Sequence, residues 1–244
     1  NIYLINIMKG IHIILTSTIN ITKKQVKDHF ISVKIKQTDP EERKACYLKA
    51  IKYWLDHTDF NITLVENSGY EYSELDEYKE KYADKFEFIS FDIHNEPDAA
   101  FIFNDFKYLS KGLLELYSIH YAYNHSRLIK EIPPSFIIKI TGRYYISNFD
   151  THLKKVDFNT YKSIRQEKDI FNRCEFVGCC HSLFKDFFSI TLRPNELKHY
   201  MYVESIYKIR HEDIITLDKV FMFKKIPLGW PTIRGGTTEV YKYF

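Results

Sequence analysis

The segment Phe136–Tyr144 reads FIIKITGRY and joins an apolar, β-branched run to a polar turn. Such a run, bounded by turn residues, is typical of a buried strand. The strand is expected over 136–140, with Thr141, Gly142, Arg143 and Tyr144 forming the loop at its carboxyl end. Lys139 lies inside the run, where an unpaired charge is costly. The segment therefore predicts a buried strand that carries polar and charged groups to one edge of a sheet.

Three earlier segments have the same form. Ile11–Leu15 (IHIIL) is followed by Thr16, Ser17 and Thr18, and Ile62–Val65 is followed by Glu66, Asn67, Ser68 and Gly69. The third apolar run is 86–91. Each predicts a buried strand that ends in a polar loop.

Helical patterns separate these strands. Asp39, Pro40 and two glutamates are typical of a helix start, and apolar residues recur at helical spacing as far as Leu55. A polar helix is expected through Leu75 and Tyr78, another helix over 107–123, and a further one over 195–210. The order predicts an α/β protein, Rossmann-like, with a mostly parallel central sheet flanked by helices. In such sheets ligands bind at the carboxyl ends of the strands.

Composition narrows the class of protein. The chain has 244 residues, of which 45% are hydrophobic and 27% charged, which is typical of a globular protein. No stretch has the length and apolarity of a transmembrane helix. The 35 basic and 32 acidic residues nearly balance, which does not favour a nucleic-acid partner.

The four cysteines are too few for a disulfide framework in a chain of this length, so a reducing, cytoplasmic location is expected. Residues Asn1–Asn6 are apolar but too short for the apolar region of a signal peptide with a cleavage site. Met8-Lys9 has the form of a native start, with residues 1–7 upstream of it.

Several familiar motifs are missing from the sequence. It contains no GxGxxG, no GxxxxGK[ST] and no GxSxG, which removes the main support for a dinucleotide-binding enzyme, a P-loop ATPase or an α/β-hydrolase. Cys174, Cys179, Cys180 and His181 do not have the spacing of a zinc site.

Candidate site residues remain at the expected ligand edge. A carboxylate at Glu66 can accept hydrogen bonds from a ribose or a base, and Gly142 lets backbone approach a ligand closely. Lys139 and Arg143 offer positive charge for a phosphate. Glu204, or a group in His211–Asp213, is a candidate general base toward a hydroxyl.

In their order, these elements resemble a GT-A type nucleotide-sugar glycosyltransferase. The resemblance is carried by Thr16-Ser17-Thr18, Glu66-Asn67-Ser68-Gly69, Lys111-Gly112-Leu113-Leu114-Glu115 and Lys139-Ile140-Thr141-Gly142-Arg143-Tyr144, and it extends over Ile11–Gly236. The Lys-x-Thr-Gly-Arg-Tyr element is similar to sugar transferases of bacteria and large viruses.

The resemblance implies a single domain over 1–244, with a nucleotide-sugar-binding half at about 9–150 and an acceptor-binding half at about 151–244. Thr16, Ser17, Thr18, Glu66 and Asn67 would hold the nucleoside. Lys111, Lys139, Thr141, Gly142 and Arg143 would lie near the donor phosphates or sugar, and Glu204 or Asp213 would act as the base. The acceptor would be a glycan or a lipid-linked sugar, as in polysaccharide biosynthesis, and contact with a membrane surface is compatible with the Lys- and aromatic-rich ends.

One departure concerns the metal. The family usually carries an Asp-x-Asp that binds a divalent cation on the donor diphosphate, and this sequence contains none. The need for Mn²⁺ or Mg²⁺ is therefore left open, and no metal ligand is assigned. Arg143 and Lys139 can supply positive charge to the leaving group in its place.

Two other functions stay open at this point. A nucleotidyltransferase normally has a Gly-rich, basic first loop, whereas the loop here is Thr-Ser-Thr-Ile-Asn. A non-catalytic glycan-binding or scaffold domain would explain the missing Asp-x-Asp but not the polar loops at every ligand edge.

Overall fold

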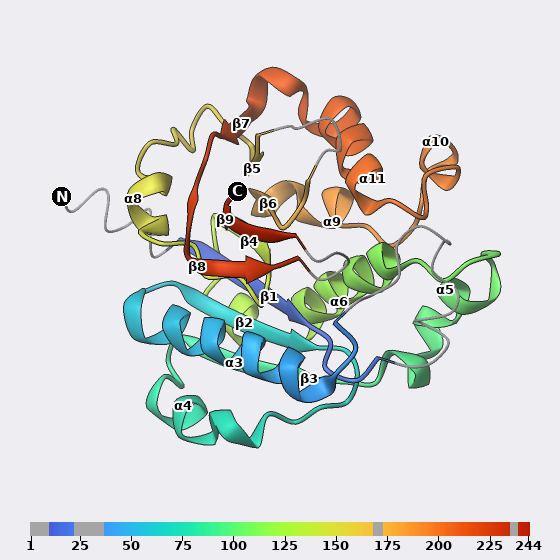
Figure 1. Cartoon of the computed structure of the whole chain (residues 1–244). Coiled ribbons are helices and arrows are strands. Elements are labelled where there is room, and N and C mark those ends of the chain that lie inside the picture. The colour runs from blue at the N-terminus through green and yellow to red at the C-terminus, as the bar shows by residue number, and fades with distance from the viewer. Residues whose placement is uncertain (1–9, 22–36, 168–172, 235–238) are drawn as a thin grey trace.

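The computed structural model describes residues 10–21, 37–167, 173–234 and 239–244 (Figure 1). The predictions for residues 1–7 and for Met8-Lys9 lie outside the described residues. No helix in the described ranges is long and apolar enough to cross a membrane.

The described strands are β1 (Ile11–Ser17), β2 (Asn61–Glu66), β3 (Phe86–Ser90), β4 (Phe136–Thr141), β5 (Ser163–Gln166), β6 (Phe176–Cys180), β7 (Val220–Phe223), β8 (Pro227–Ile233) and β9 (Val240–Tyr243). The described α-helices are α3 (Pro40–His57), α4 (Asp76–Lys81), α5 (Ala100–Asn104), α6 (Lys111–His125), α7 (Arg127–Glu131), α8 (Phe149–Leu153), α9 (Phe184–Phe187), α10 (Pro194–Leu197) and α11 (Val203–Arg210).

The central sheet has seven strands in the order β3-β2-β1-β4-β6-β5-β7, and β8 and β9 form a separate hairpin. Strands β1 to β4 are parallel to their neighbours in this group, while β6 runs antiparallel to both β4 and β5. The prediction of an α/β protein with a mostly parallel sheet flanked by helices is confirmed. The antiparallel β6 is a feature that the sequence pattern did not indicate.

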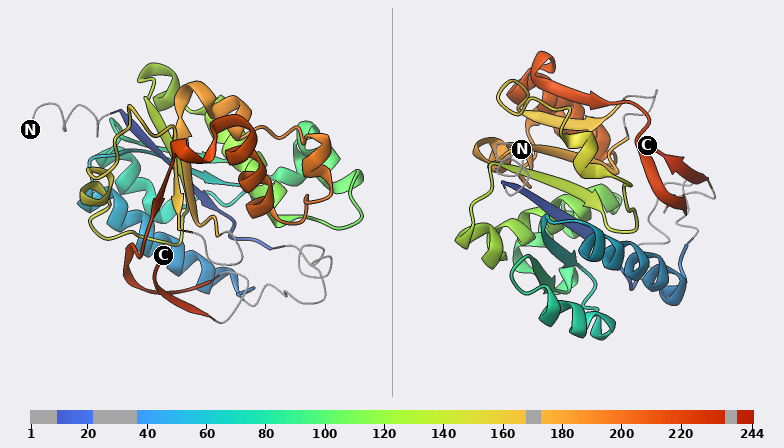
Figure 2. Two further views of the ribbon diagram at one scale, coloured as in Figure 1. Left: turned by 90° about the horizontal axis from the view of Figure 1, so that it is seen from above. Right: turned by 90° about the vertical axis from the view of Figure 1, so that its left-hand side faces the viewer.

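Alternation along the buried strands divides the core into two layers. On one face Ile11, Ile13 and Leu15 pack with Trp54 of α3, and the β8–β9 hairpin covers the same face (Figures 1 and 2). On the other face Ile14 packs with residues of α6, α9 and α11. Successive strand side chains point to opposite faces, so β1 supplies both layers of the core.

Local capping explains where the helices begin. The Asp39 side chain accepts a hydrogen bond from the Glu41 backbone N–H at 2.9 Å, and Pro40 occupies the first turn, as the sequence predicted for α3. The helix expected from residue 107 begins later, at Lys111. The Ser110 hydroxyl caps it by accepting from the Leu113 N–H at 3.2 Å.

The single helix predicted over 195–210 is wrong. The structure has α10 and α11 with a turn between them, and a π-helical turn, His211–Ile215, follows α11. Glu196 and Arg210 are fully buried and form an ion pair at 2.8 Å. In one straight helix these residues would be about 21 Å apart, so this contact requires the chain to fold back.

Two histidines are buried among apolar side chains. The His12 ring lies 2.8 Å from the Thr63 hydroxyl, and the His211 ring lies 2.8 Å from the Ser163 hydroxyl. Burial lowers the pKa of each ring from its ordinary 6.5 to about 3. Both histidines are therefore held neutral in the folded chain.

This burial predicts a loss of stability in acid. The unfolded chain binds protons at these rings below pH 6.5, while the folded chain does so only near pH 3, so stability present above pH 6.5 is lost as the pH falls. Each ring contributes ~1.4 kcal/mol per pH unit to the slope of the free energy of unfolding against pH. We expect the free energy of unfolding, measured with urea at pH values between 6 and 5, to fall less steeply with decreasing pH for His12→Gln than for the wild type. The exposed His57→Gln is the control, and equal slopes for all three proteins would contradict the prediction.

Candidate functional site

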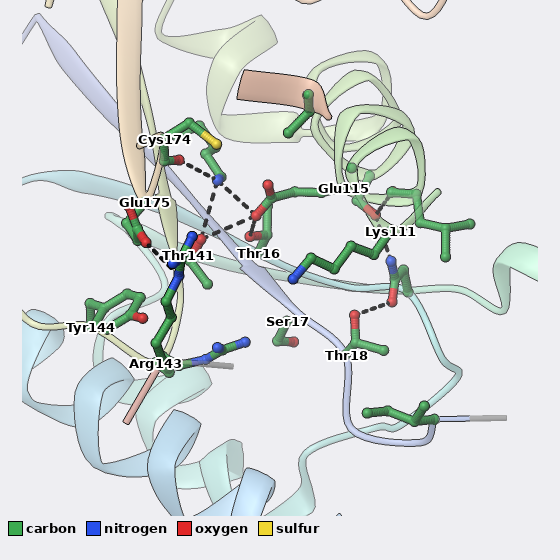
Figure 3. A pocket seen from close by; sticks show the side chains of 18 of the residues that line it. Thr16, Ser17, Thr18, Lys111, Glu115, Thr141, Arg143, Tyr144, Cys174 and Glu175 are labelled. Carbon is green, nitrogen blue, oxygen red and sulfur yellow. Dashed lines mark hydrogen bonds and ion pairs between the residues drawn. The ribbon is translucent and has the colours of Figure 1, made fainter. Parts of the chain in front are cut away.

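The strand order changes direction between β1 and β4. From β1 the chain proceeds through β2 to β3 on one side, and then returns to place β4 on the other side of β1. Ligands of open α/β sheets bind outside the carboxyl ends of the strands at such a point. A cavity lies there, lined by residues that follow β1 and β4 and by residues of α3, α6 and α11 (Figure 3). With its open mouth it holds roughly 1140 Å³ of space not filled by protein atoms.

The alternation of β1 and β4 turns three polar side chains toward α6. Thr16 and Thr141 are paired across the two strands, and Lys139 lies two residues before Thr141 on the same face. From α6, Glu115 meets all three: its Oε1 lies 2.7 Å from the Lys139 ammonium and accepts from the Thr16 and Thr141 hydroxyls at 3.0 and 3.1 Å. Lys139 also donates to the Cys174 carbonyl at 2.9 Å.

The Lys139–Glu115 pair fixes the charge of both groups. Burial raises the pKa of the Glu115 carboxyl, but the Lys139 ammonium and the two threonine hydroxyls outweigh it and hold that pKa below its usual value. Burial likewise lowers the pKa of Lys139, and Glu115 outweighs it, so the pKa is raised. The Lys139 side chain is 1% exposed. Its charge is thus engaged by Glu115 rather than presented to a ligand.

Arg143 reaches the cavity through a tight contact between the strand ends. The Gly142 N–H donates to the Thr16 carbonyl at 2.8 Å, and a Cβ on Gly142 would lie 2.9 Å from that carbonyl oxygen. Only glycine lets the chain after β4 remain this close to β1. The next residue, Arg143, then extends over the cavity and donates to the Tyr47 hydroxyl at 3.1 Å.

Helix α3 supplies a second arginine to this wall. Arg43 donates to the Thr18 carbonyl through Nε at 2.8 Å, and its Nη2 lies 3.5 Å from the Tyr47 hydroxyl. Burial raises the pKa of Tyr47, but the guanidinium groups of Arg143 and Arg43 outweigh it, so the pKa is lowered. The phenol thus holds two cations side by side at the cavity wall.

Lys111 and Arg143 approach one another from opposite walls. Figure 3 shows both side chains pointing into the cavity, toward the region of Ser17. The pKa of Lys111 is lowered, first by desolvation within the cavity walls and then by the nearby Arg143 and Arg234. Lys111 begins α6 and Glu115 lies one turn later, so the two side chains share one helix face.

Glu204 lies on α11 and lines the same cavity. Burial raises its pKa, and Glu175 and Glu115 raise it further, while Lys111 opposes them. Among the candidate bases, the structure brings Glu204 to the cavity. Asp213 lies outside the lining, where it accepts from Asn195 at 3.1 Å and contacts Arg193 at 3.4 Å.

The loop after β2 is organised by Glu66, which is fully buried. Its carboxylate accepts from the backbone N–H groups of Ile19, Ser68 and Tyr70 at 2.8, 2.8 and 3.0 Å. Burial nevertheless raises its pKa. Glu66 is not among the residues that line the cavity. Its place in the structure is that of a support for the loop rather than a ligand contact.

Asn67 joins this loop to the cavity. Its side-chain oxygen accepts from the Thr18 hydroxyl at 2.7 Å, and its nitrogen donates to the Ser118 hydroxyl on α6 at 2.8 Å. Both hydrogen bonds position the β1 end against α6. Asn67 and Thr18 therefore form one end of the cavity wall.

Nine of the residues singled out in the sequence line this cavity: Thr16, Ser17, Thr18, Asn67, Lys111, Lys139, Thr141, Arg143 and Glu204. Gly142 supports it through backbone contact. Sequence reasoning missed Arg43, Tyr47, Glu175 and Arg234, and it gave Glu115 no role. Only Glu115 carried a local signal, since it lies four residues after Lys111 and so on the same helix face.

The side chains of the cavity do not suit the divalent cation that the GT-A resemblance implies. Within the described residues, no three His, Cys, Asp or Glu side chains are grouped so that they could hold a metal ion. Glu115 contacts Lys139, and Glu175 contacts Arg234 at 3.6 Å. We therefore derive no step through a metal.

Among the solved structures that this chain resembles are two at low sequence identity. One is a protein from Desulfovibrio desulfuricans G20 described as a nucleotide-diphospho-sugar transferase, with a TM-score of 0.46, 11% identity, and coverage of 88% of this chain and 80% of that one. The other is an active-site mutant of LgtC, with a TM-score of 0.40, 8% identity, and coverage of 86% and 72%. No protein-family model and no curated protein sequence matches the chain.

The buried ion pair leads to a stability prediction. Glu115→Leu leaves the Lys139 ammonium buried without its partner and should lower the free energy of unfolding by about 3–5 kcal/mol. Adding Lys139→Met should restore most of that loss, because no buried charge then remains. Urea denaturation of the two single variants and the double variant measures the coupling.

The control for this cycle is Asp150→Asn, which removes the exposed Lys154–Asp150 pair and should change stability by less than about 0.5 kcal/mol. Additive effects of the Glu115 and Lys139 substitutions would show that the two charges do not depend on one another.

Proposed function

We propose that this protein is a glycosyltransferase that uses a nucleotide-diphosphate sugar as donor. The observation that carries the proposal is the convergence of Lys111 and Arg143 over the carboxyl end of β1, at the switch point of the sheet. Cations that converge in a partly enclosed cavity suit a diphosphate, because they stabilise the charge that develops as it leaves. Arg143 also offers a planar fork of donors that matches phosphate oxygens.

The balance of charge supports the same ligand. Among the described lining residues, five basic side chains face three carboxylates, an excess of two positive charges. A diphosphate esterified at both ends carries two negative charges. We propose that the diphosphate binds between Lys111 and Arg143 without a divalent metal. Thr18 and Asn67 then lie toward the nucleoside.

Glu204 is the proposed general base. In the transfer, the acceptor oxygen forms a bond to the anomeric carbon of the sugar while its proton passes to the Glu204 carboxylate. The bond from that carbon to the diphosphate oxygen breaks, and the electron pair leaves with the nucleoside diphosphate. A direct displacement of this kind inverts the anomeric configuration. A carboxylate with a raised pKa is a stronger base for this proton than an ordinary one.

The acceptor in this proposal is a glycan or a lipid-linked sugar. A cytoplasmic location and peripheral contact with a membrane are part of the same proposal and stay predictions. A non-catalytic glycan-binding domain would not require two cations and a half-buried carboxylate to converge in one cavity, which is why we favour the transferase.

Nucleotide binding provides the first test. The thermal unfolding temperature is measured in the presence of UDP, GDP, CMP or dTDP. One nucleoside diphosphate should raise it, because a ligand that binds the folded state stabilises that state by mass action. The shift should be the same with EDTA as with Mn²⁺. Lys111→Ala should weaken the binding of that nucleotide about tenfold or more, because a charged hydrogen bond is lost.

The matched control is Lys107→Ala, a nearby exposed lysine outside the cavity, which should bind as the wild type does. No shift with any nucleotide from folded protein would overturn the transferase proposal. A shift that requires Mn²⁺ would overturn its metal-free part.

The role of Glu204 predicts a pH dependence. Transfer needs the carboxylate form, and the pKa of Glu204 is raised above its ordinary 4.5, so the rate should rise with pH along a limb that lies above pH 4.5. Glu204→Gln should remove this limb and lower the rate of nucleotide release from the donor about 100-fold. Donor affinity should stay within about threefold of the wild type. Glu212→Gln is the matched control, and a retained limb in Glu204→Gln would contradict the assignment.

A further inference from the structure

Glu175 is a carboxylate in the cavity wall with one oxygen left over. It lies just before β6, and its side chain is only 10% exposed. Oε1 faces Arg234 at 3.6 Å. Oε2 is buried, and among the described residues no group donates a hydrogen bond to it. A buried acceptor without a donor is costly, so a ligand that supplies one would bind with a gain.

Glu115 also has an oxygen without a donor among the described residues, and its side chain is more exposed, at 20%. Its contacts with Lys139, Thr16 and Thr141 all fall on Oε1. Within the described part of the chain, Oε2 takes part in no hydrogen bond. Both residues line the cavity, and the oxygens of a carboxylate can only accept hydrogen bonds.

Glu175, Glu115 and Glu204 all line the cavity. Figure 3 shows Glu175 on the side of Tyr144 and Cys174, away from Thr18 and Lys111. A donor with its nucleoside toward Thr18 and its diphosphate between Lys111 and Arg143 therefore carries its sugar toward the carboxylates.

We infer that Glu175 and Glu115 select donors whose sugar presents hydroxyl groups and no carboxylate. The inference rests on the proposed function and adds the class of sugar to it. A hydroxyl donates to Glu175 Oε2, which has no other donor among the described residues, or to Oε2 of the more exposed Glu115. A sugar carboxylate at the same place has no proton to donate and brings like charges together.

The charge balance supports this selection. The excess of two positive charges in the lining is matched by the two charges of a diphosphate diester. A neutral sugar leaves that balance intact, whereas a uronic acid adds a negative charge beside Glu175. Such repulsion between like charges suppresses binding of the wrong ligand.

The test compares two donors that differ only at C6 of the sugar. UDP-glucose and UDP-glucuronate share their nucleotide and ring and differ by CH₂OH against COO⁻. If the thermal screen identifies a nucleotide other than UDP, the corresponding pair of neutral and acidic donor sugars linked to that nucleotide is used instead. Isothermal titration of the wild-type protein should show the acidic donor binding at least about tenfold more weakly than the neutral one. This comparison needs no variant.

A variant then assigns the discrimination to a residue. Glu175→Gln keeps the size of the side chain and removes its charge, so the preference for the neutral donor should fall at least about threefold. Affinity for the free nucleoside diphosphate, which lacks the transferred sugar, should be unchanged. Exposed Glu77→Gln is the matched control and should keep the wild-type preference.

The outcomes separate the two proposals. If no nucleoside diphosphate binds to the wild type, the proposed function fails and the inference fails with it. If the nucleoside diphosphate binds but the acidic donor binds as well as the neutral one, the inference alone is overturned. It is also overturned if Glu175→Gln folds and leaves the wild-type preference intact.

Discussion

A lysine buried inside a parallel sheet constrains the whole ligand edge. The buried Lys139 ammonium needs a carboxylate as its partner. It lies on the face of β4 that is turned toward α6, where Glu115 Oε1 lies 2.7 Å from it. The same Glu115 oxygen accepts from Thr16 on β1 and Thr141 on β4. One carboxylate thus ties two strand ends to a helix, and it fixes where Lys111, one turn earlier on α6, enters the cavity.

Positive charge in the cavity is divided by what each group contacts. The charge of Lys139 is paired with Glu115. Arg143 instead contacts the Tyr47 hydroxyl, which Arg43 also contacts. A phenol orients a guanidinium without cancelling its charge as a carboxylate does. The cavity therefore separates the cation that stabilises the fold from those that remain for a ligand, although Lys139 and Arg143 are only four residues apart in the sequence.

Much of the scaffold could be predicted from the sequence. Strands β1 to β4 and the start of α3 follow from apolar runs, polar loops and the Asp39 cap, which are local signals. The antiparallel β6 and the break between α10 and α11 could not, because a contact such as Glu196 with Arg210 joins residues that no local pattern relates. In the site, the strand-end residues were readable in the same way. Arg43, Tyr47 and Glu175 were not, since their importance comes from partners distant in the chain.

The direction of β6 has a consequence for how this site can vary. Because β6 runs antiparallel to β4, the residues that precede β6 arrive at the edge where β4 ends, and Glu175 stands there beside the loop of Arg143. Glu175 thus belongs to a different segment of the chain from Lys111 and Arg143. Replacement of the side chains at 173–175 would change one end of the cavity while those two cations keep their places, so in the proposed transferase the sugar end can vary while the nucleotide end stays constant.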